Sequence, residues 1–222
     1  MPVMKLLTAL FWILYVPVYA QTWTSGELKA ANTAANANYL SAEEKNIIFY
    51  MNLARLDGEK FFKTCFMEYV EANNEEMKQY SNYDELKIEK HTSYYKSLKK
   101  DLQQIKGLPM LYPDKALCQV AANQAGDLNR HNLTGHISST GTTPAMRIGK
   151  IYPRKALAEN CEFGNSKGLN IVCNLLLDKG VPSLGHRINI LNTSYRFNFV
   201  GVSIARHPSY RFCSVIDFVA LH

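Results

Sequence analysis

The sequence predicts an α+β fold in which several helices are followed by a small antiparallel sheet. Two patterns carry this prediction. Apolar residues recur at helical spacing through much of the chain, whereas roughly the last thirty residues alternate between apolar and polar as strands do. Of the 222 residues, 47% are hydrophobic and 20% are charged, which is typical of one folded domain with a real core.

The N-terminus has the pattern of a secretory signal peptide. Lys5 precedes the apolar stretch 6–16, and Val18-Tyr19-Ala20 supplies the small residues that come before a cleavage site. We expect cleavage after Ala20 and a mature protein that is secreted or held in the periplasm or cell envelope. The alternative is an uncleaved anchor, although the apolar stretch is short for a bilayer span.

The whole chain has a net charge of +6, from 25 basic and 19 acidic residues. Removal of residues 1–20 takes away Lys5 and no acid, which leaves 24 basic residues against 19 acidic ones and a net charge of +5. This mild excess predicts weak association with an anionic envelope surface. The lysines alternate with glutamates and no base-stacking pattern accompanies them, so nucleic acid is excluded as a partner.

The five cysteines fit no CxxC metal pattern, and their odd number leaves at least one thiol unpaired. We expect buried, small apolar side chains, with one or two disulfides as the alternative that an exported protein permits. The pairing stays open. The five positions are Cys65, Cys118, Cys161, Cys173 and Cys213.

Residues 21–40 lack a helical or strand period and are interpreted as a flexible lead-in to a domain that spans 41–222. Ser41 and Glu44 form a capping box that predicts a helix over 42–56. Further helices are predicted over 61–70, 84–105 and 114–131, with an exposed connection at 73–83.

Gly, Ser, Thr and Pro residues predict an ordered loop over 133–149, and this loop carries His136. A buried helix follows at 169–177, and a break at 181–185 places His186 just ahead of a second helical stretch. Strands at 197–205 and 212–219 are joined by a turn at 207–210, which predicts a hairpin.

Five short motifs occur in a characteristic order. They are Asn52-Leu53-Ala54-Arg55, then His136-Ile137-Ser138-Ser139-x-Gly141-x-x-Pro144-x-x-Arg147-Ile148, then Glu159-Asn160, then Gly185-His186-Arg187-x-Asn189-Ile190-Leu191, and lastly Val200-Gly201-Val202 ahead of the strand that ends in Asp217-Phe218. In this order the chain resembles a bacterial-type member of the CAP superfamily, which groups cysteine-rich secretory proteins, antigen five and plant pathogenesis-related proteins. The resemblance covers about residues 42–219, with a helical insertion at about 65–105.

The resemblance implies an α-β-α sandwich with a small antiparallel sheet flanked by helices and a central cleft that gathers two histidines and two acids. By position the histidines are His136 and His186, and the first acid is Glu159. The helix before the second histidine offers no glutamate where animal members carry the second acid. Asp178 substitutes there only if that helix presents it inward.

Two imidazoles beside a carboxylate suit a divalent metal. We therefore predict that His136 and His186 bind Zn²⁺ or another divalent ion, with Glu159 as a candidate general base. Alternatively, these polar groups only hydrogen-bond loop backbone. Cys161 beside a histidine could be a nucleophile, but a structural or disulfide role is preferred because nothing lowers its pKa.

The predicted function is a binding module for a divalent metal or an unidentified small ligand. A fold does not imply turnover, so we expect binding rather than catalysis. One alternative is a metal-assisted hydrolase of peptides or envelope polymers that uses the same cleft. Others are a scaffold that docks a protein partner on the insertion and a lipid-binding module.

Overall fold

The structure is a computed structural model and describes residues 22–221. The predicted signal peptide and its cleavage site therefore lie outside the described residues. The helices are α1 (Ser25–Ala31), α2 (Ala42–Leu56), α3 (Gly58–Phe61), α4 (Met67–Met77), α5 (Tyr83–Leu86), α6 (Ser93–Gln103), α7 (Lys115–His131), α8 (Pro144–Gly149), α9 (Gly168–Leu177) and α10 (Gly185–Ile190), with a π-helical turn, η1 (Phe62–Phe66), between α3 and α4.

The α+β fold class is confirmed. The strands are β1 (Tyr112–Pro113), β2 (Leu157–Phe163), β3 (Phe199–His207) and β4 (Arg211–Val219), in the order β1-β3-β4-β2. β3 and β4 form the predicted hairpin, and β2 pairs antiparallel with β4. The short β1 runs parallel to β3, so the sheet is mixed and not purely antiparallel as expected.

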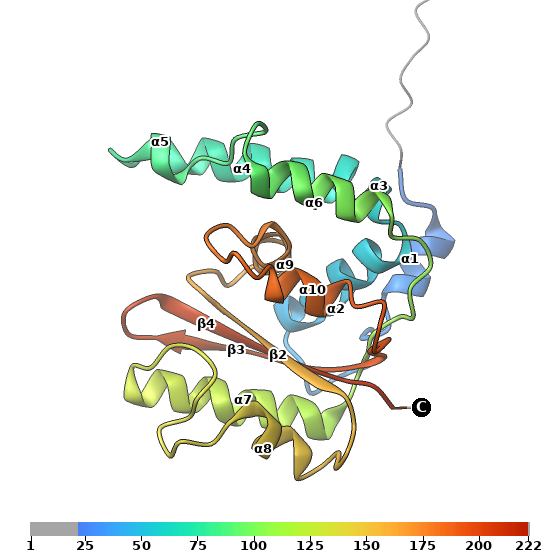
Figure 1. Cartoon of the computed structure of the whole chain (residues 1–222), viewed down its shortest axis with the longest axis vertical. Coiled ribbons are helices and arrows are strands. Elements are labelled where there is room, and N and C mark those ends of the chain that lie inside the picture. The colour runs from blue at the N-terminus through green and yellow to red at the C-terminus, as the bar shows by residue number, and fades with distance from the viewer. Residues whose placement is uncertain (1–21, 222) are drawn as a thin grey trace, which may run out of the picture.

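Helices cover the sheet on both faces (Figure 1). α7 and α8 lie on one face, and α2, α9 and α10 lie on the other, with the α3–α6 arm beyond them. Gly201 explains how closely α7 approaches β3, because a Cβ atom there would lie 2.3 Å from the backbone carbon of Leu117. Val200 and Val202, on either side of this glycine, are buried in the core on the α2 and α9 side.

The predicted helix over 42–56 is confirmed, and Ser41 and Glu44 form its capping box. Two polar residues of this helix are fully buried. Asn52 binds the backbone oxygens of Ala31 and Leu111, both at 3.0 Å. Arg55 donates to the carbonyl oxygens of Ile190 and Phe197, at 2.7 and 2.6 Å, and so ties α2 to the end of α10.

Residues 21–40 were expected to be flexible, but their described part contains α1 and packs on α2. Thr24 and Glu27 form a capping box, and Ala31 and Ala34 are buried. The helix has only seven residues, too few to show an apolar stripe. Contacts distant in sequence hold it, among them the ion pair between Glu27 and Lys60 at 2.8 Å.

The insertion is more helical than predicted. Helical structure runs from α3 through η1 to the end of α4, across part of the expected connection at 73–83, while the expected long helix over 84–105 is broken into α5 and α6. The break arises because the side-chain amide of Asn74 donates to the carbonyl oxygen of Ile88 and accepts the Ile88 N–H, and because Thr92 caps α6.

The predicted helices over 114–131 and 169–177 are confirmed as α7 and α9. The loop over 133–149 is ordered as expected but ends in a short helix, α8, because Thr143 caps it and Pro144 occupies its first turn. Among the helices of residues 22–221, none combines the length and the apolar character that a bilayer crossing requires.

Candidate functional site

The loop between α7 and α8 holds His136 in place through Arg147 on α8. One guanidinium nitrogen of Arg147 donates to the carbonyl oxygens of His136 and Thr142, at 3.1 and 2.7 Å. The other reaches Oε2 of Glu159 on β2. Farther along the loop, Asp127 of α7 accepts the backbone N–H of Ser139 at 2.6 Å. The loop is thus pinned to α7 on one side and to the edge of the sheet on the other.

Glu159 is buried beneath the imidazole of His136. Its side chain is 1% exposed, that of His136 is 44% exposed, and Oε1 lies 2.9 Å from Nδ1 of the ring. Burial alone would raise the pKa of Glu159, but the hydrogen bond from His136 and the charge of Arg147 outweigh it and keep the pKa below its ordinary value. An ionised carboxylate only accepts, so the hydrogen of this bond belongs to Nδ1, and in a neutral ring Nε2 then carries the lone pair.

His186 has the same arrangement with another carboxylate. Its Nδ1 lies 2.7 Å from Oδ1 of Asp178, whose side chain is 1% exposed. Oδ2 of Asp178 accepts the backbone N–H groups of His186 and Arg187, at 3.1 and 3.3 Å. Asp178 thus lies at the start of α10 and faces inward from the end of α9.

The two histidine–carboxylate pairs lie beside the same edge strand, β2. Alternate residues of a strand face opposite sides of the sheet. Glu159 faces α8, while the next residue, Asn160, donates to the carbonyl oxygen of His186 at 3.0 Å and accepts from Asn189 at 2.8 Å. The Glu159-Asn160 motif therefore fixes one histidine with each of its side chains.

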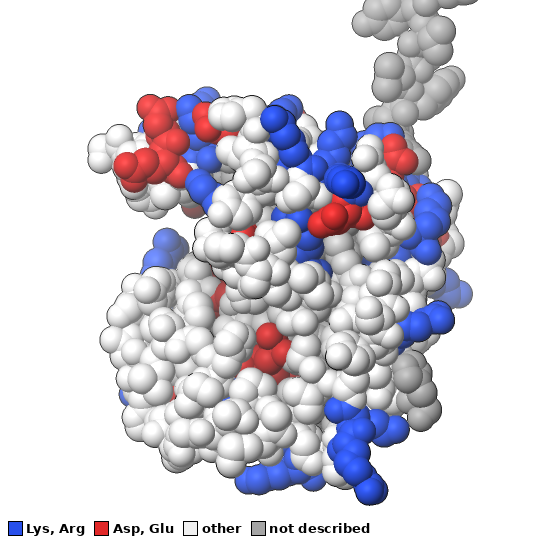
Figure 2. All heavy atoms as spheres, in the orientation of Figure 1, with Lys and Arg blue, Asp and Glu red and all other residues white. Residues whose placement is uncertain are grey.

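A small cleft of about 220 Å³ lies beside His186, between β2 and α9. Glu162 and Asp178 line it together with His186. Figure 2 shows that charged side chains gather on the helical arm, whereas the face over the sheet has few, apart from acidic atoms in a recess beside β2.

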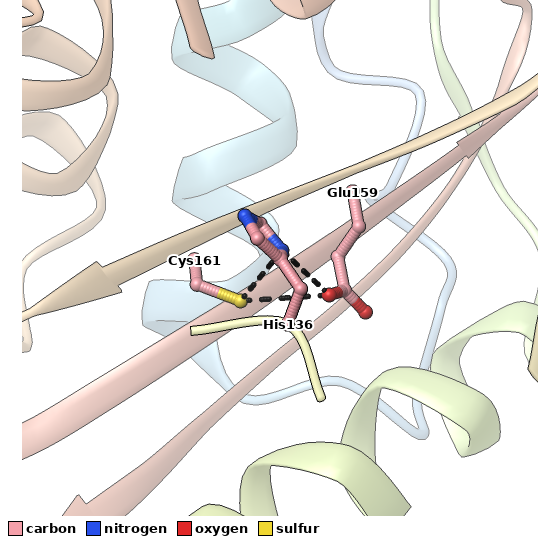
Figure 3. Close-up of side chains that lie close together, drawn as sticks. All are labelled: His136, Glu159 and Cys161. Atoms are coloured by element: carbon pink, nitrogen blue, oxygen red, sulfur yellow. Dashed lines mark hydrogen bonds and ion pairs between the residues drawn. The ribbon is translucent and has the colours of Figure 1, made fainter. Parts of the chain in front are cut away.

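Cys161 lies beside both His136 and Glu159. Figure 3 shows Cys161, His136 and Glu159 converging, with the other ring nitrogen directed away from the cluster across β2. The Cys161 Sγ atom lies 3.6 Å from Nδ1 of His136 and 3.7 Å from Oε1 of Glu159. Burial and the nearby carboxylates raise the pKa of Cys161 well above its ordinary range, which argues against a thiolate nucleophile.

The sequence and the fold can be compared with those of known proteins. The family model described as CAP, the cysteine-rich secretory protein family, matches residues 25–219. The chain belongs to the CAP family. The match begins at Ser25, the first residue of α1.

Two solved structures resemble this CAP domain. An extracellular protein with an SCP domain from Bacillus anthracis is 25% identical, with a TM-score of 0.41, over 51% of this chain and 35% of that one. An outer surface protein from Borrelia burgdorferi is 26% identical, with a TM-score of 0.43, over 58% of this chain and 90% of that one. The match thus spans about a third of the Bacillus anthracis protein. No curated protein matches the chain.

Within the CAP domain, sequence reasoning named both histidines and Glu159 and weighed Asp178. It quoted Arg147 and Asn160 without giving them roles, because their partners are backbone and side-chain groups that only the fold brings near. All five cysteines are buried and unpaired, so the disulfide alternative is absent from the structure. The general-base role of Glu159 stays a prediction, and its lowered pKa favours a role in orienting His136 instead.

Proposed function

We propose that this CAP domain binds a divalent metal ion such as Zn²⁺ through Nε2 of His136 and Nε2 of His186, and that it acts outside the cell or at its envelope. One observation carries the proposal: Nδ1 of each histidine lies within hydrogen-bond distance of its own buried carboxylate. Metal-binding histidines usually make this bond, which fixes the tautomer and makes the other nitrogen a better ligand.

The donor set fits such an ion. Neutral imidazole is a common zinc ligand, and two imidazoles leave coordination positions for water or a ligand. Consecutive residues of β2, Glu159 and Asn160, hold the ring of one histidine and the backbone of the other beside the same edge strand. The exposed ring of His136 and the cleft beside His186 give access from solvent. When bound, the ion would polarise a ligand or lower the pKa of a bound water.

Export is part of the proposal. The signal-peptide pattern at 1–20 supports it, as does the family's description as secretory. A protein outside the cell meets metal ions directly, and the cleft beside His186 has room for a small ligand.

Isothermal titration calorimetry with Zn²⁺ on the chelator-treated mature protein tests the proposal. We expect 1:1 binding that is lost in His136→Ala and weakened at least tenfold in His186→Ala, which leaves only the His136 side of the site. The matched control is His91→Ala, which removes an imidazole whose side chain is 76% exposed. Zinc binding that survives both substitutions, or no zinc binding by the folded wild type, would refute the proposal.

A further inference from the structure

Three potential ligand atoms of different chemistry converge on the α7 and α8 side of β2. They are Nδ1 of His136, Oε1 of Glu159 and Sγ of Cys161, all within 4.8 Å of one another (Figure 3). The N···O separation is 2.9 Å, and sulfur lies 3.6 Å from the nitrogen and 3.7 Å from the oxygen. This cluster does not include His186.

These separations are close to those around a tetrahedral zinc ion. Ordinary zinc–ligand bond lengths give edges of about 3.4 Å between N and O, and about 3.6 Å from S to either atom. Both sulfur distances already match. The N···O distance would have to open by about 0.5 Å, which is the change expected when a hydrogen bond gives way to two bonds to one ion.

A second carboxyl group lies next to this cluster. The register of β2 and β4 places Asp217 directly opposite Glu159, on the same face of the sheet. Asp217 is fully buried, and neither of its carboxyl oxygens has a hydrogen-bond partner within residues 22–221. Arg147 neutralises Oε2 of Glu159 but leaves Oε1 facing His136 and Cys161.

We infer that His136, Glu159 and Cys161 form a second, thiolate-containing metal site that accepts a soft divalent ion such as Zn²⁺ or Cd²⁺. Sulfur ligation selects soft ions over Mg²⁺ and Ca²⁺. Binding breaks the S–H bond of Cys161 and releases one proton to solvent, while the Nδ1 proton of His136 moves to the exposed Nε2. Because that nitrogen then carries a proton, the His136 ring serves this site or the shared one with His186, but not both at once.

Cadmium titration of the mature protein, followed by ultraviolet absorption, tests this inference, because cadmium bound to thiolate has a charge-transfer band. We expect a band that saturates at 1:1 and disappears in Cys161→Ser. The matched control is Cys213→Ser, which removes a thiol from the same apolar cluster and should keep the band. Calorimetry in two buffers of different ionisation enthalpy should show release of one proton per ion.

The variant His186→Ala separates this inference from the proposed function, because it should keep the cadmium band unchanged. A band that persists in Cys161→Ser, or no band in the folded wild type, would overturn the inference even if zinc binding required His186. Cys161→Ala, checked by circular dichroism, guards against a serine variant that fails to fold. A band kept in His186→Ala, together with zinc binding indifferent to His186, would support this site and refute the shared one.

Discussion

Glu159 and Asn160 are neighbours on β2, and their side chains leave the strand on opposite faces to hold one histidine each. Glu159 accepts from the imidazole of His136, whereas Asn160 donates to the backbone of His186. A two-residue motif thereby sets the position of both predicted metal ligands.

Replacing Glu159 by Gln should weaken zinc binding by about 10- to 100-fold, because loss of an outer carboxylate makes a histidine a poorer and less oriented ligand. A general base would behave differently, since its loss would abolish turnover with little change in affinity. Calorimetry distinguishes the two roles. The control is Glu43→Gln, which removes a carboxylate bonded to the backbone of Gly168 and to neither histidine.

Replacing Asn160 by Ala should weaken zinc binding without removing any ligand atom. The change removes the donor to the carbonyl oxygen of His186 and leaves the amide of Asn189 with only a long bond of 3.5 Å to the carbonyl oxygen of Glu159. A buried polar group left unsatisfied costs about 1–3 kcal/mol, so a loss of about 1 kcal/mol of folding stability is expected at these partly buried groups. Urea unfolding measures that loss. Unchanged zinc affinity in a variant with this stability loss would show that Asn160 stabilises the fold but does not position His186.

Replacing Arg187 by Lys should lower the free energy of unfolding by at least about 3 kcal/mol. The buried guanidinium donates to the last carbonyl oxygens of α9 and to Asp101 on α6, and an ammonium group cannot reproduce this fork. The control is Arg130→Lys, where the side chain is 65% exposed. Equal melting temperatures for the two variants would contradict the expectation.

The docking of α1 should weaken in acid. The hydrogen bond from Lys60 lowers the pKa of Glu27 from 4.5 to about 2. A lowered folded-state pKa gives stability that is complete above pH 4.5 and is lost as the pH falls toward 2. Lys60 also lies 4.7 Å from the ring of Trp23, the one tryptophan of the chain after Ala20.

Trp23 fluorescence should therefore follow this loss directly. In Glu27→Gln the pH dependence between 4.5 and 2 should flatten. In Glu59→Gln, which breaks an exposed pair with Lys63, the dependence should remain. An acid transition of Trp23 that is the same in all three proteins would rule out Glu27 as its source.

Elements with strong local signals could be predicted from the sequence alone. The helix over 42–56 has a capping box and an apolar period, and the β3–β4 hairpin has clear alternation, so both were predicted correctly. α1 was missed because seven residues held by Asn52 and Lys60 carry no period of their own. Strand β2 was missed because its buried polar residues hide the alternation.

The histidines and Glu159 were found because an ordered set of motifs marks them. The role of Asp178 depended on a feature that periodicity cannot predict, the left-handed conformation in which it ends α9. That turn brings its carboxylate back to the start of α10. Asp217 was quoted only as part of a closing strand, and its place opposite Glu159 follows from the strand register, which a single sequence does not specify.

The hydrogen bonds between α6 and Arg187 make the inserted arm part of the same cooperative unit as α10. Ser97 and Asp101 bind a guanidinium whose backbone neighbour is His186. Local opening of the arm would remove Ser97 and Asp101 from the buried guanidinium of Arg187, which is unfavourable. The arm and α10 should therefore exchange their amide hydrogens together. A partner that stabilises or destabilises the arm would then change how long His186 stays in its position. Residues far from the cleft would thus control the lifetime of that position.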